Sequence, residues 1–287
     1  MPRPAVPRLV LRPVPSSEPR YARVWRFDRA GNARYARLSR SGPARAARTA
    51  LVAAAGWAAY RWWRVASSPA RYRLRWKRRE LRRGTLRYAA LGDSLAQGIG
   101  ASDPERGYVG LLAARLERAT GRTVEVINLS DAGIMIHDLM RDQLPVLRAM
   151  DPRPDLVTVT VGTNDAGRLT PGQLRERFDE LCSGLPPGTL VADLPRFHRG
   201  RRARAAVEAS AVLRDVLAGH PTLVHVPLQR ATERTGLAHR SADLFHPNDR
   251  GHRFYADTFW ADTFWGRHLL GRATSRNPAV VRCLLLR

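Results

Sequence analysis

The sequence contains very little cysteine. Its 287 residues include two cysteines, Cys182 and Cys283, which are too few for a disulfide framework. Neither has a histidine or a second cysteine beside it, so the surroundings of a thiol nucleophile or a zinc site are missing. We expect Cys182 to be a small buried apolar side chain within a helix. This usage is compatible with a reducing compartment.

Lysine is almost absent as well, because Lys77 is the single lysine among 49 basic residues. The charge is also uneven: residues 1–84 hold 22 basic and 3 acidic residues, and residues 85–287 hold 27 basic and 22 acidic ones. The arginine bias is typical of a GC-rich coding sequence, and no recognition motif accompanies the charge, so we expect no specific nucleic-acid partner. For residues 1–84 two interpretations remain open, a disordered arm and contact with an anionic lipid surface.

The sequence also lacks an apolar run of the roughly 20 residues that a membrane-spanning helix needs. The segment 49–60 is apolar but short and alanine-rich, with Arg61 and Arg64 close behind it. Three interpretations of this segment remain open: a short interfacial or marginal membrane anchor, the apolar region of a signal peptide, and a soluble helix. If the segment spans a membrane, the basic residues from Arg71 to Arg83 predict that the rest of the chain stays in the cytoplasm. We therefore expect a location in the cytoplasm or at the inner face of the membrane rather than secretion.

Composition predicts three parts along the chain. Residues 1–84 form an N-terminal extension. Within it, residues 1–43 are rich in proline and arginine without a period, so we assign no fold to them, and residues 44–84 hold the apolar segment and a strongly basic connector. Residues 85–265 form one folded domain. Residues 266–287 form a tail to which we assign no role.

Strand-like and helix-like segments alternate from residue 85 onward. The apolar runs that predict strands are 86–91, 124–129, 156–161, 190–194 and 223–226. Helical spacing is found between and after these runs, at 109–119, 137–150, 173–182, 203–217 and 250–264. Continuous β-branched runs such as 156–161 are typical of strands that are buried on both faces. The alternation predicts a three-layer α/β/α sandwich with a five-stranded parallel sheet.

Ser94 follows the first predicted strand, in the sequence Gly-Asp-Ser-Leu. The carboxyl ends of parallel strands are where reacting groups collect in an open α/β sheet. A hydroxyl alone is a poor nucleophile and needs a base that a third group orients. Asp243 and His246 lie three residues apart in a later segment, and they are candidates for the orienting acid and the base.

Two segments between these residues offer hydrogen-bond donors. Gly133 follows the second predicted strand, and its lack of a side chain lets its backbone amide approach a ligand. Asn164 follows the most hydrophobic strand, and its side-chain amide can donate to a developing oxyanion. An ordinary turn at Gly133 and a helix cap at Asn164 are the structural alternatives. Residues 134–136 either line an acyl pocket or pack under the next helix.

A metal site is a rival interpretation of the last segment. Its ligands would be His239, Asp243, His246 and His252. The spacing of these residues matches none of the usual zinc patterns, so we expect no metal and no organic cofactor. We expect His252 to be a structural residue of the last helix.

The four polar segments, taken in this order, resemble those of the SGNH hydrolases, also called the GDSL esterase/lipase family. The invariant letters of the family fall on Ser94, Gly133, Asn164 and His246, and the resemblance covers residues 85–265. It implies a flavodoxin-like α/β/α sandwich and a carboxylic ester hydrolase. It also implies that Ser94 is the nucleophile, His246 the base and Asp243 its orienting acid. The oxyanion hole would consist of the Ser94 and Gly133 amides and the Asn164 side chain.

The resemblance leaves the substrate open. We expect a small ester or acyl compound, because the same motifs serve relatives that act on lipids, thioesters, acetylated sugars and simple esters. Two other functions remain open: an acyltransferase with the same acyl-enzyme chemistry, and a non-catalytic module that the basic arm tethers to a membrane. The presence of all four segments argues against the module. The oligomeric state is not predicted.

Overall fold

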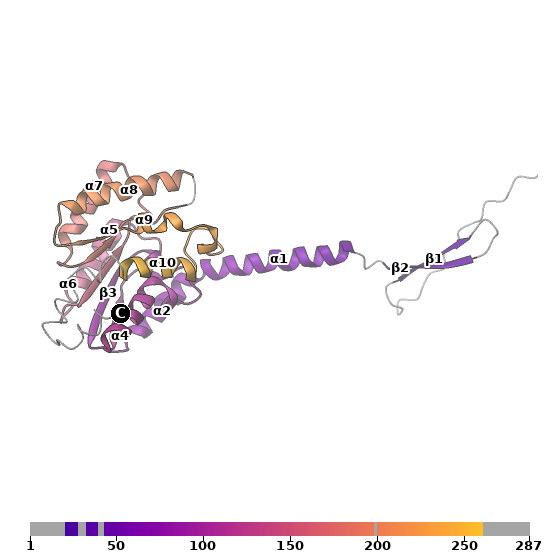
Figure 1. Cartoon of the computed structure of the whole chain (residues 1–287), viewed down its shortest axis with the longest axis horizontal. Helices are drawn as coiled ribbons and strands as arrows, with labels where there is room; N and C mark the ends of the chain where they lie inside the picture. The colour runs from indigo at the N-terminus through magenta and orange to yellow at the C-terminus, as the bar shows by residue number, and fades with distance from the viewer. Residues whose placement is uncertain (1–20, 28–32, 40–42, 198–199, 261–287) are drawn as a thin grey trace, which may run out of the picture. The chain divides into compact units, whose positions relative to one another are not determined.

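The computed structural model describes residues 21–27, 33–39, 43–197 and 200–260 (Figure 1). The chain divides into two compact units, Met1–Ala59 and Tyr60–Arg287.

The first unit contains a β-hairpin. Strand β1 (Tyr21–Phe27) pairs antiparallel with β2 (Ala33–Ser39), with Tyr21 opposite Ser39. The sequence analysis assigned no fold to residues 1–43, so this pair of strands was not predicted. Four of the seven residues of β1 are aromatic or β-branched, which favours a strand locally. Strand β2 holds one such residue, Tyr35, and the average composition of the whole region, rich in proline and arginine, indicates neither strand.

Helix α1 (Pro43–Ala66) begins in the first unit and includes the apolar segment 49–60. Its first residue is Pro43. Proline suits this position because its φ angle is already fixed near the helical value, and because the N–H that it lacks would have no acceptor within the helix. Among the helices that the structure describes, none combines the length and the apolar character needed to cross a bilayer.

The second unit is built on a parallel sheet of five strands in the order β4-β3-β5-β6-β7. The strands are β3 (Leu86–Gly92), β4 (Val124–Asn128), β5 (Leu156–Thr160), β6 (Leu190–Ala192) and β7 (Val224–Val226). Each lies within or within one residue of a predicted run, so the sequence-based fold class is confirmed. The strand order reverses between β3 and β5, and in such sheets ligands bind at this switch point, beyond the carboxyl ends of the strands.

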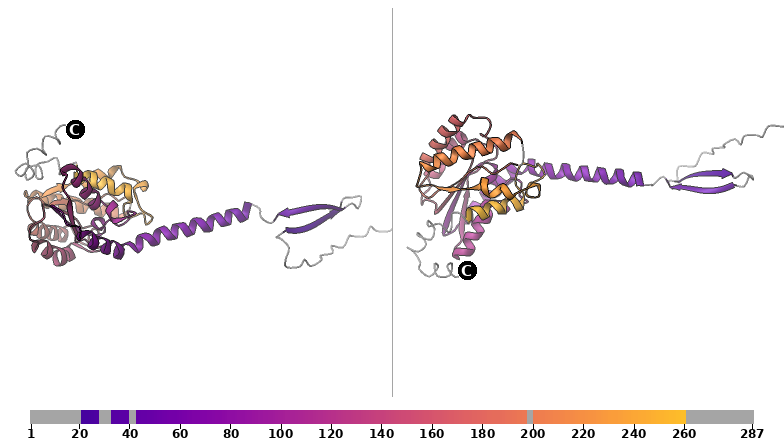
Figure 2. Two further views of the ribbon diagram at one scale, coloured as in Figure 1. Left: turned by 90° about the horizontal axis from the view of Figure 1, so that it is seen from below. Right: turned by 45° about the horizontal axis from the view of Figure 1, so that its top comes forward.

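Helices cover both faces of the sheet (Figures 1 and 2). Successive side chains of β3 point to opposite faces, so Ala89 and Leu91 enter one core while Tyr88 and Ala90 enter the other. The first core is closed by α6 (Leu144–Arg148), α7 (Pro171–Gly184) and α8 (Arg201–Ala218). The second is closed by α2 (Ser68–Glu80), α4 (Tyr108–Thr120) and α10 (Asp249–Phe259). Cys182 is buried in the first core as expected, and burial raises the pKa of its thiol to about 12.

One predicted helix is interrupted. The segment 137–150 was expected to be continuous, but it consists of α5 (Ile136–Asp138), a π-helical turn η2 (Leu139–Gln143) and α6. Pro145 has no N–H to donate to the preceding turn, so the regular α-helical hydrogen-bond ladder cannot pass through it. The last predicted helix, 250–264, corresponds to α10, which is described to Phe259, and residues 261–264 of the prediction lie outside the described part of the chain.

Helix α2 occupies the segment that composition had indicated to be a basic connector. Its buried residues Ser68, Tyr72, Trp76 and Arg79 form a stripe with helical spacing. Trp76 is 3% exposed and donates from Nε1 to the Gln97 carbonyl at 3.0 Å. The Tyr72 hydroxyl donates to the Ala101 carbonyl at 2.6 Å. The folded unit therefore includes residues that precede the predicted boundary at residue 85.

Replacing Trp76 tests the contribution of α2 to the core. Trp76→Ala should lower the free energy of unfolding by about 3–5 kcal/mol, because it removes a buried aromatic side chain and leaves a cavity. Leu74→Ala is the control on the exposed side of the same helix and should change it by less than about 0.5 kcal/mol. Urea denaturation followed by circular dichroism measures both. Equal effects of the two substitutions would show that α2 does not belong to the core.

Candidate active site

The structure brings Ser94, His246 and Asp243 together at the carboxyl end of the sheet. The His246 Nε2 atom lies 3.0 Å from Ser94 Oγ, and His246 Nδ1 lies 2.6 Å from Asp243 Oδ2. An ionised carboxylate can only accept, so the Nδ1–H donates to Asp243 and the Nε2 lone pair faces the serine hydroxyl. This arrangement leaves a base in contact with a hydroxyl.

Ser94 lies on a tight turn that only glycine permits. Strand β3 ends at Gly92, whose φ is +140°, and a Cβ there would overlap the Thr160 carbonyl oxygen of β5. The next residue, Asp93, donates its N–H to the same carbonyl at 3.1 Å and accepts from the Leu95 N–H at 2.9 Å, which caps helix α3 (Ser94–Gln97). The turn thus places Ser94 at the first position of a helix, where backbone N–H groups have no helical acceptor.

Asp93 is completely buried directly beside the candidate nucleophile. Burial raises the pKa of its carboxyl from 3.8 to about 7, although the Leu95 N–H and the nearby His246 favour the charged form. Its second oxygen has no hydrogen-bond partner among the described residues. The side chain therefore holds a proton at pH values where an exposed aspartate is ionised.

The pKa of the Asp243 carboxyl is shifted in the opposite direction from that of Asp93. Its Oδ1 accepts from Ser241 Oγ at 2.6 Å and from the N–H groups of Phe245 and His246 at 3.0 Å. Burial by itself would raise the pKa of Asp243, but the hydrogen bonds from His246, Ser241 and the backbone outweigh it and hold the pKa well below its usual range. The chain reaches this geometry through Leu244, which has a left-handed φ of +57° that is uncommon for residues other than glycine.

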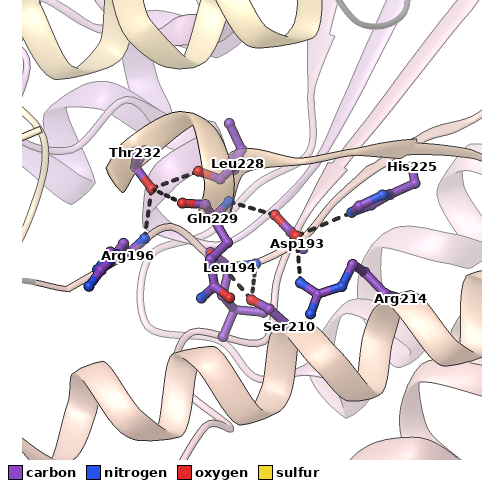
Figure 3. A network of polar contacts seen from close by, with 9 residues as sticks. All are labelled: Asp193, Leu194, Arg196, Ser210, Arg214, His225, Leu228, Gln229 and Thr232. Atoms are coloured by element: carbon purple, nitrogen blue, oxygen red, sulfur yellow. Dashed lines mark hydrogen bonds and ion pairs between the residues drawn. The ribbon is translucent and has the colours of Figure 1, made fainter. Parts of the chain in front are cut away.

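A polar network surrounds Asp193, the residue that follows strand β6 (Figure 3). The buried Asp193 carboxylate accepts from the Gln229 N–H at 2.7 Å and contacts the side chains of His225 and Arg214. Arg196 donates its N–H to Thr232 in the same network at 2.8 Å.

Arg240 joins this network to the histidine loop. The Arg240 guanidinium donates to the carbonyls of Arg196 and Phe245. Phe245 also contacts the His246 ring edge-on and stacks on Phe197. Phe245, the residue before His246, is therefore fixed both through its backbone and through its side chain.

Gln143 supports the other side of the site. Its side-chain amide accepts from the Gly92 N–H at 2.8 Å and donates to the Gly92 carbonyl at 3.0 Å. The π-helical turn η2 delivers this side chain, and it is buried. Sequence reasoning missed Gln143, because a glutamine within a helical segment carries no motif.

The two candidate oxyanion segments are fastened to each other. Asn164 donates from Nδ2 to the Ile134 carbonyl at 2.8 Å, and the buried Asp165 carboxylate accepts from the Ile136 N–H at 3.2 Å. Gly133 is exposed and has a φ of +88°, which favours glycine. Ile136 is buried in the first core and Ile134 packs against it, so both follow the packing alternative rather than the pocket one.

His252 does not join the site. Its Nε2 donates to the Ile99 carbonyl at 3.1 Å and its Nδ1 accepts from the Tyr108 N–H at 3.3 Å. Burial lowers the pKa of this imidazole to about 4, so it is neutral and structural. The four ligands of the rival metal interpretation are not assembled, and no other group of three or more histidine, cysteine or acidic side chains in the described residues is arranged to hold a metal.

Comparison with known families assigns the chain. The sequence model of the GDSL-like lipase/acylhydrolase family matches residues 90–254, which is more than half of the chain. The chain belongs to this family. This GDSL-family protein is therefore a carboxylic ester hydrolase, and the matched range contains every candidate site residue. A search of curated proteins finds no match.

Solved structures share the fold of this GDSL-family protein. LAE5, an α/β hydrolase enzyme from the metagenome of Lake Arreo in Spain, is 22% identical with a TM-score of 0.52, over 63% of this chain and 95% of that one. A variant of Axe2, an acetyl xylan esterase from Geobacillus stearothermophilus, is 18% identical with a TM-score of 0.52, over 62% and 94%. A lipase/acylhydrolase from Enterococcus faecalis is 20% identical with a TM-score of 0.52, over 61% and 93%. At these identities the similarity concerns the fold alone.

Replacing Gly100 tests the close approach of the histidine loop. Gly100 has a φ of +94°, and a Cβ there would overlap the Pro247 carbonyl oxygen and lie 2.8 Å from His246 Cβ. Gly100→Ala should therefore push His246 away from Ser94 and lower kcat on p-nitrophenyl acetate by at least about 100-fold. The control is Gly121→Ala, where φ is also positive (+66°) but nothing lies within 4 Å. Equal losses in the two variants would refute the steric explanation.

Replacing Asp93 tests the buried proton. Because the pKa of Asp93 is raised to about 7 in the folded protein, the folded state binds an extra proton between about pH 4 and pH 7. The free energy of unfolding should fall as the pH rises through this range, by up to about 4 kcal/mol from this group. The Asp93→Asn side chain cannot titrate, so the free energy of unfolding of this variant should fall less than that of the parent over the same pH range. Urea denaturation at pH 4.5 and 7.5 measures the difference.

The control for this experiment is Asp103→Asn. Asp103 accepts from the Glu105 N–H at 2.9 Å in the same capping geometry, but it is half-buried rather than fully buried. We expect this variant to keep the pH dependence of the parent. If Asp93→Asn keeps it too, Asp93 is already ionised in the folded protein.

Proposed function

We propose that this protein is a serine esterase that cleaves carboxylic esters through an acyl-enzyme on Ser94. The observation that carries the proposal is the unbroken line of contacts from Asp243 through His246 to Ser94, with separations of 2.6 Å and 3.0 Å. In this line each group has the partner that nucleophilic catalysis requires: a hydroxyl beside a base, and a base beside an orienting acid.

The first step transfers the Ser94 proton to His246 while the oxygen attacks the ester carbonyl. Asp243 holds the imidazole in the tautomer that presents Nε2 to the serine, and it stabilises the imidazolium that forms. Its lowered pKa keeps the carboxylate ionised throughout the neutral range. His246 then gives the proton to the leaving alcohol, and an ester bond to Ser94 remains.

The oxyanion of the tetrahedral intermediate is held by backbone and side-chain N–H groups. We assign the Ser94 N–H, the Gly133 N–H and the Asn164 amide to this role. The hydrogen bond from Asn164 to Ile134 orients the amide group, and a second N–H remains on the same nitrogen to donate to the substrate. Such donors act by preorganisation, because they need not move as charge develops.

Water completes the cycle by attacking the acyl-enzyme with His246 as general base. The carboxylic acid then leaves and the Ser94 hydroxyl is restored. We assign a small ester or acyl compound as the substrate, and hydrolysis rates for p-nitrophenyl esters from C2 to C12 will define the acyl group. Product analysis with an added alcohol separates this reaction from acyl transfer, which would yield an ester of that alcohol.

Two substitutions test the assigned roles. Ser94→Ala should abolish labelling by a fluorophosphonate probe, because the attacking oxygen is gone. Asn164→Ala should keep the labelling and lower kcat by about 10²–10³, the usual effect of losing one oxyanion donor. Ser183→Ala, which changes an exposed serine of α7, is the control and should behave like the parent protein. Labelling of the Ser94→Ala protein would disprove the assignment of the nucleophile.

A further inference from the structure

Helix α2 has two faces of opposite character. The inner face, which contains Tyr72 and Trp76, packs against the rest of the second unit. On the other side, spacings of three and four residues bring together the side chains that we call the outer face of α2: Leu74, Lys77, Arg78 and Leu81. All four are exposed, Leu74 by 60% and Leu81 by 79%.

The cations of the outer face are not neutralised within the described part of the chain. Other arginines of the same region have acidic partners, since Arg73 pairs with Asp131 and Arg83 pairs with Glu125. Lys77 and Arg78 form no such ion pair with any described residue. One side of α2, including its C-cap Leu81, therefore presents two leucines, together with two cations that have no ion-pair partner in the described part of the chain.

The end of α1, which precedes α2 in the chain, also exposes large apolar side chains. Trp62 and Trp63 are both more than half exposed. Pro69 has no N–H to donate to the Val65 carbonyl, and the Ser68 hydroxyl donates to this carbonyl instead at 2.6 Å. Helix α1 ends at Ala66 and α2 begins at Ser68, so a single residue separates the two helices. From residue 61 to residue 83 the sequence contains ten basic residues and one acidic residue, Glu80.

We propose that the outer face of α2 binds the anionic surface of a lipid bilayer. Leucines that insert into the interface, cations that contact lipid phosphates and tryptophans at headgroup level are the three components of such binding. Exposed leucines would contribute nothing to a purely electrostatic contact with nucleic-acid phosphates, so the combination favours a membrane. No described helix can span a bilayer, which is consistent with binding at the surface.

This docking would act directly on the ester hydrolase unit. Trp76 and Tyr72 fasten α2 to the Gln97 and Ala101 carbonyls, which belong to the segment that follows Ser94. A membrane bound to the outer face would therefore hold the whole second unit rather than a separate arm. The inference does not depend on the catalytic roles proposed above.

The test is a flotation assay of the full chain with vesicles of phosphatidylcholine alone or with 30% phosphatidylglycerol. We expect binding to the anionic vesicles that weakens with salt. Lys77→Gln/Arg78→Gln should weaken it about 25-fold, because one basic side chain at an anionic surface contributes about fivefold. Leu74→Ala/Leu81→Ala should weaken it at both low and high salt.

The matched control is Arg175→Gln/Arg177→Gln, which removes two exposed arginines from α7 and should leave binding within about twofold of the parent. All variants should keep their activity on p-nitrophenyl acetate, which shows that they are folded. The proposal fails if the parent does not bind the anionic vesicles or if the outer-face variants bind like the control. It also fails if the outer-face substitutions leave vesicle binding unchanged and instead abolish binding to polyuridylic acid. The same holds if they instead abolish a dimer of this chain that is detected by ultracentrifugation.

Discussion

At the end of β3 the backbone of Gly92 passes so close to the Thr160 carbonyl of β5 that no side chain fits between them. The same carbonyl accepts the Asp93 N–H, and Gln143 binds both polar groups of Gly92. These contacts fix the direction in which the chain leaves the sheet, and therefore the position of the Ser94 hydroxyl. The line from Asp243 through His246 to Ser94 depends on this turn, because a shift of about 1 Å would break a hydrogen bond of 3.0 Å.

Asp93 and Asp243 show how hydrogen bonding separates the pKa values of two carboxyl groups in one site, the first fully buried and the second partly buried. Asp93 has one hydrogen-bond donor within the described residues, so burial dominates and raises its pKa to about 7. Asp243 has four donors, and together they outweigh burial and lower its pKa. The number of donors around each carboxyl, rather than its depth alone, decides whether it is neutral or charged. The neutral group can support the turn without opposing the negative charge that develops on a reacting ester.

The sequence predicted the five-stranded sheet correctly, and it also singled out candidate catalytic groups, because both have local signatures. Each strand is a short apolar run, and Ser94, Asp243 and His246 lie in recognisable motifs. Gln143 and Trp76 could not be predicted in the same way, since their roles arise from contacts with Gly92 and Gln97 that are distant in sequence. The hairpin of β1 and β2 was missed for another reason: its strand-forming residues are diluted by the composition around them. Local patterns therefore indicated the candidate site residues but not the residues that hold them in place.

The π-helical turn before α6 has a consequence for how this chain can change in evolution. A π-turn contains one residue more per turn than an α-helix, and each residue of an α-helix advances by about 100° around the axis. Deleting one residue between Leu139 and Gln143 would remove the extra residue of this turn and would rotate the Gln143 side chain by about 100°, away from Gly92. Such a deletion would thus detach the support beneath Ser94. The irregular turn is for this reason a constraint on insertions and deletions in the family segment.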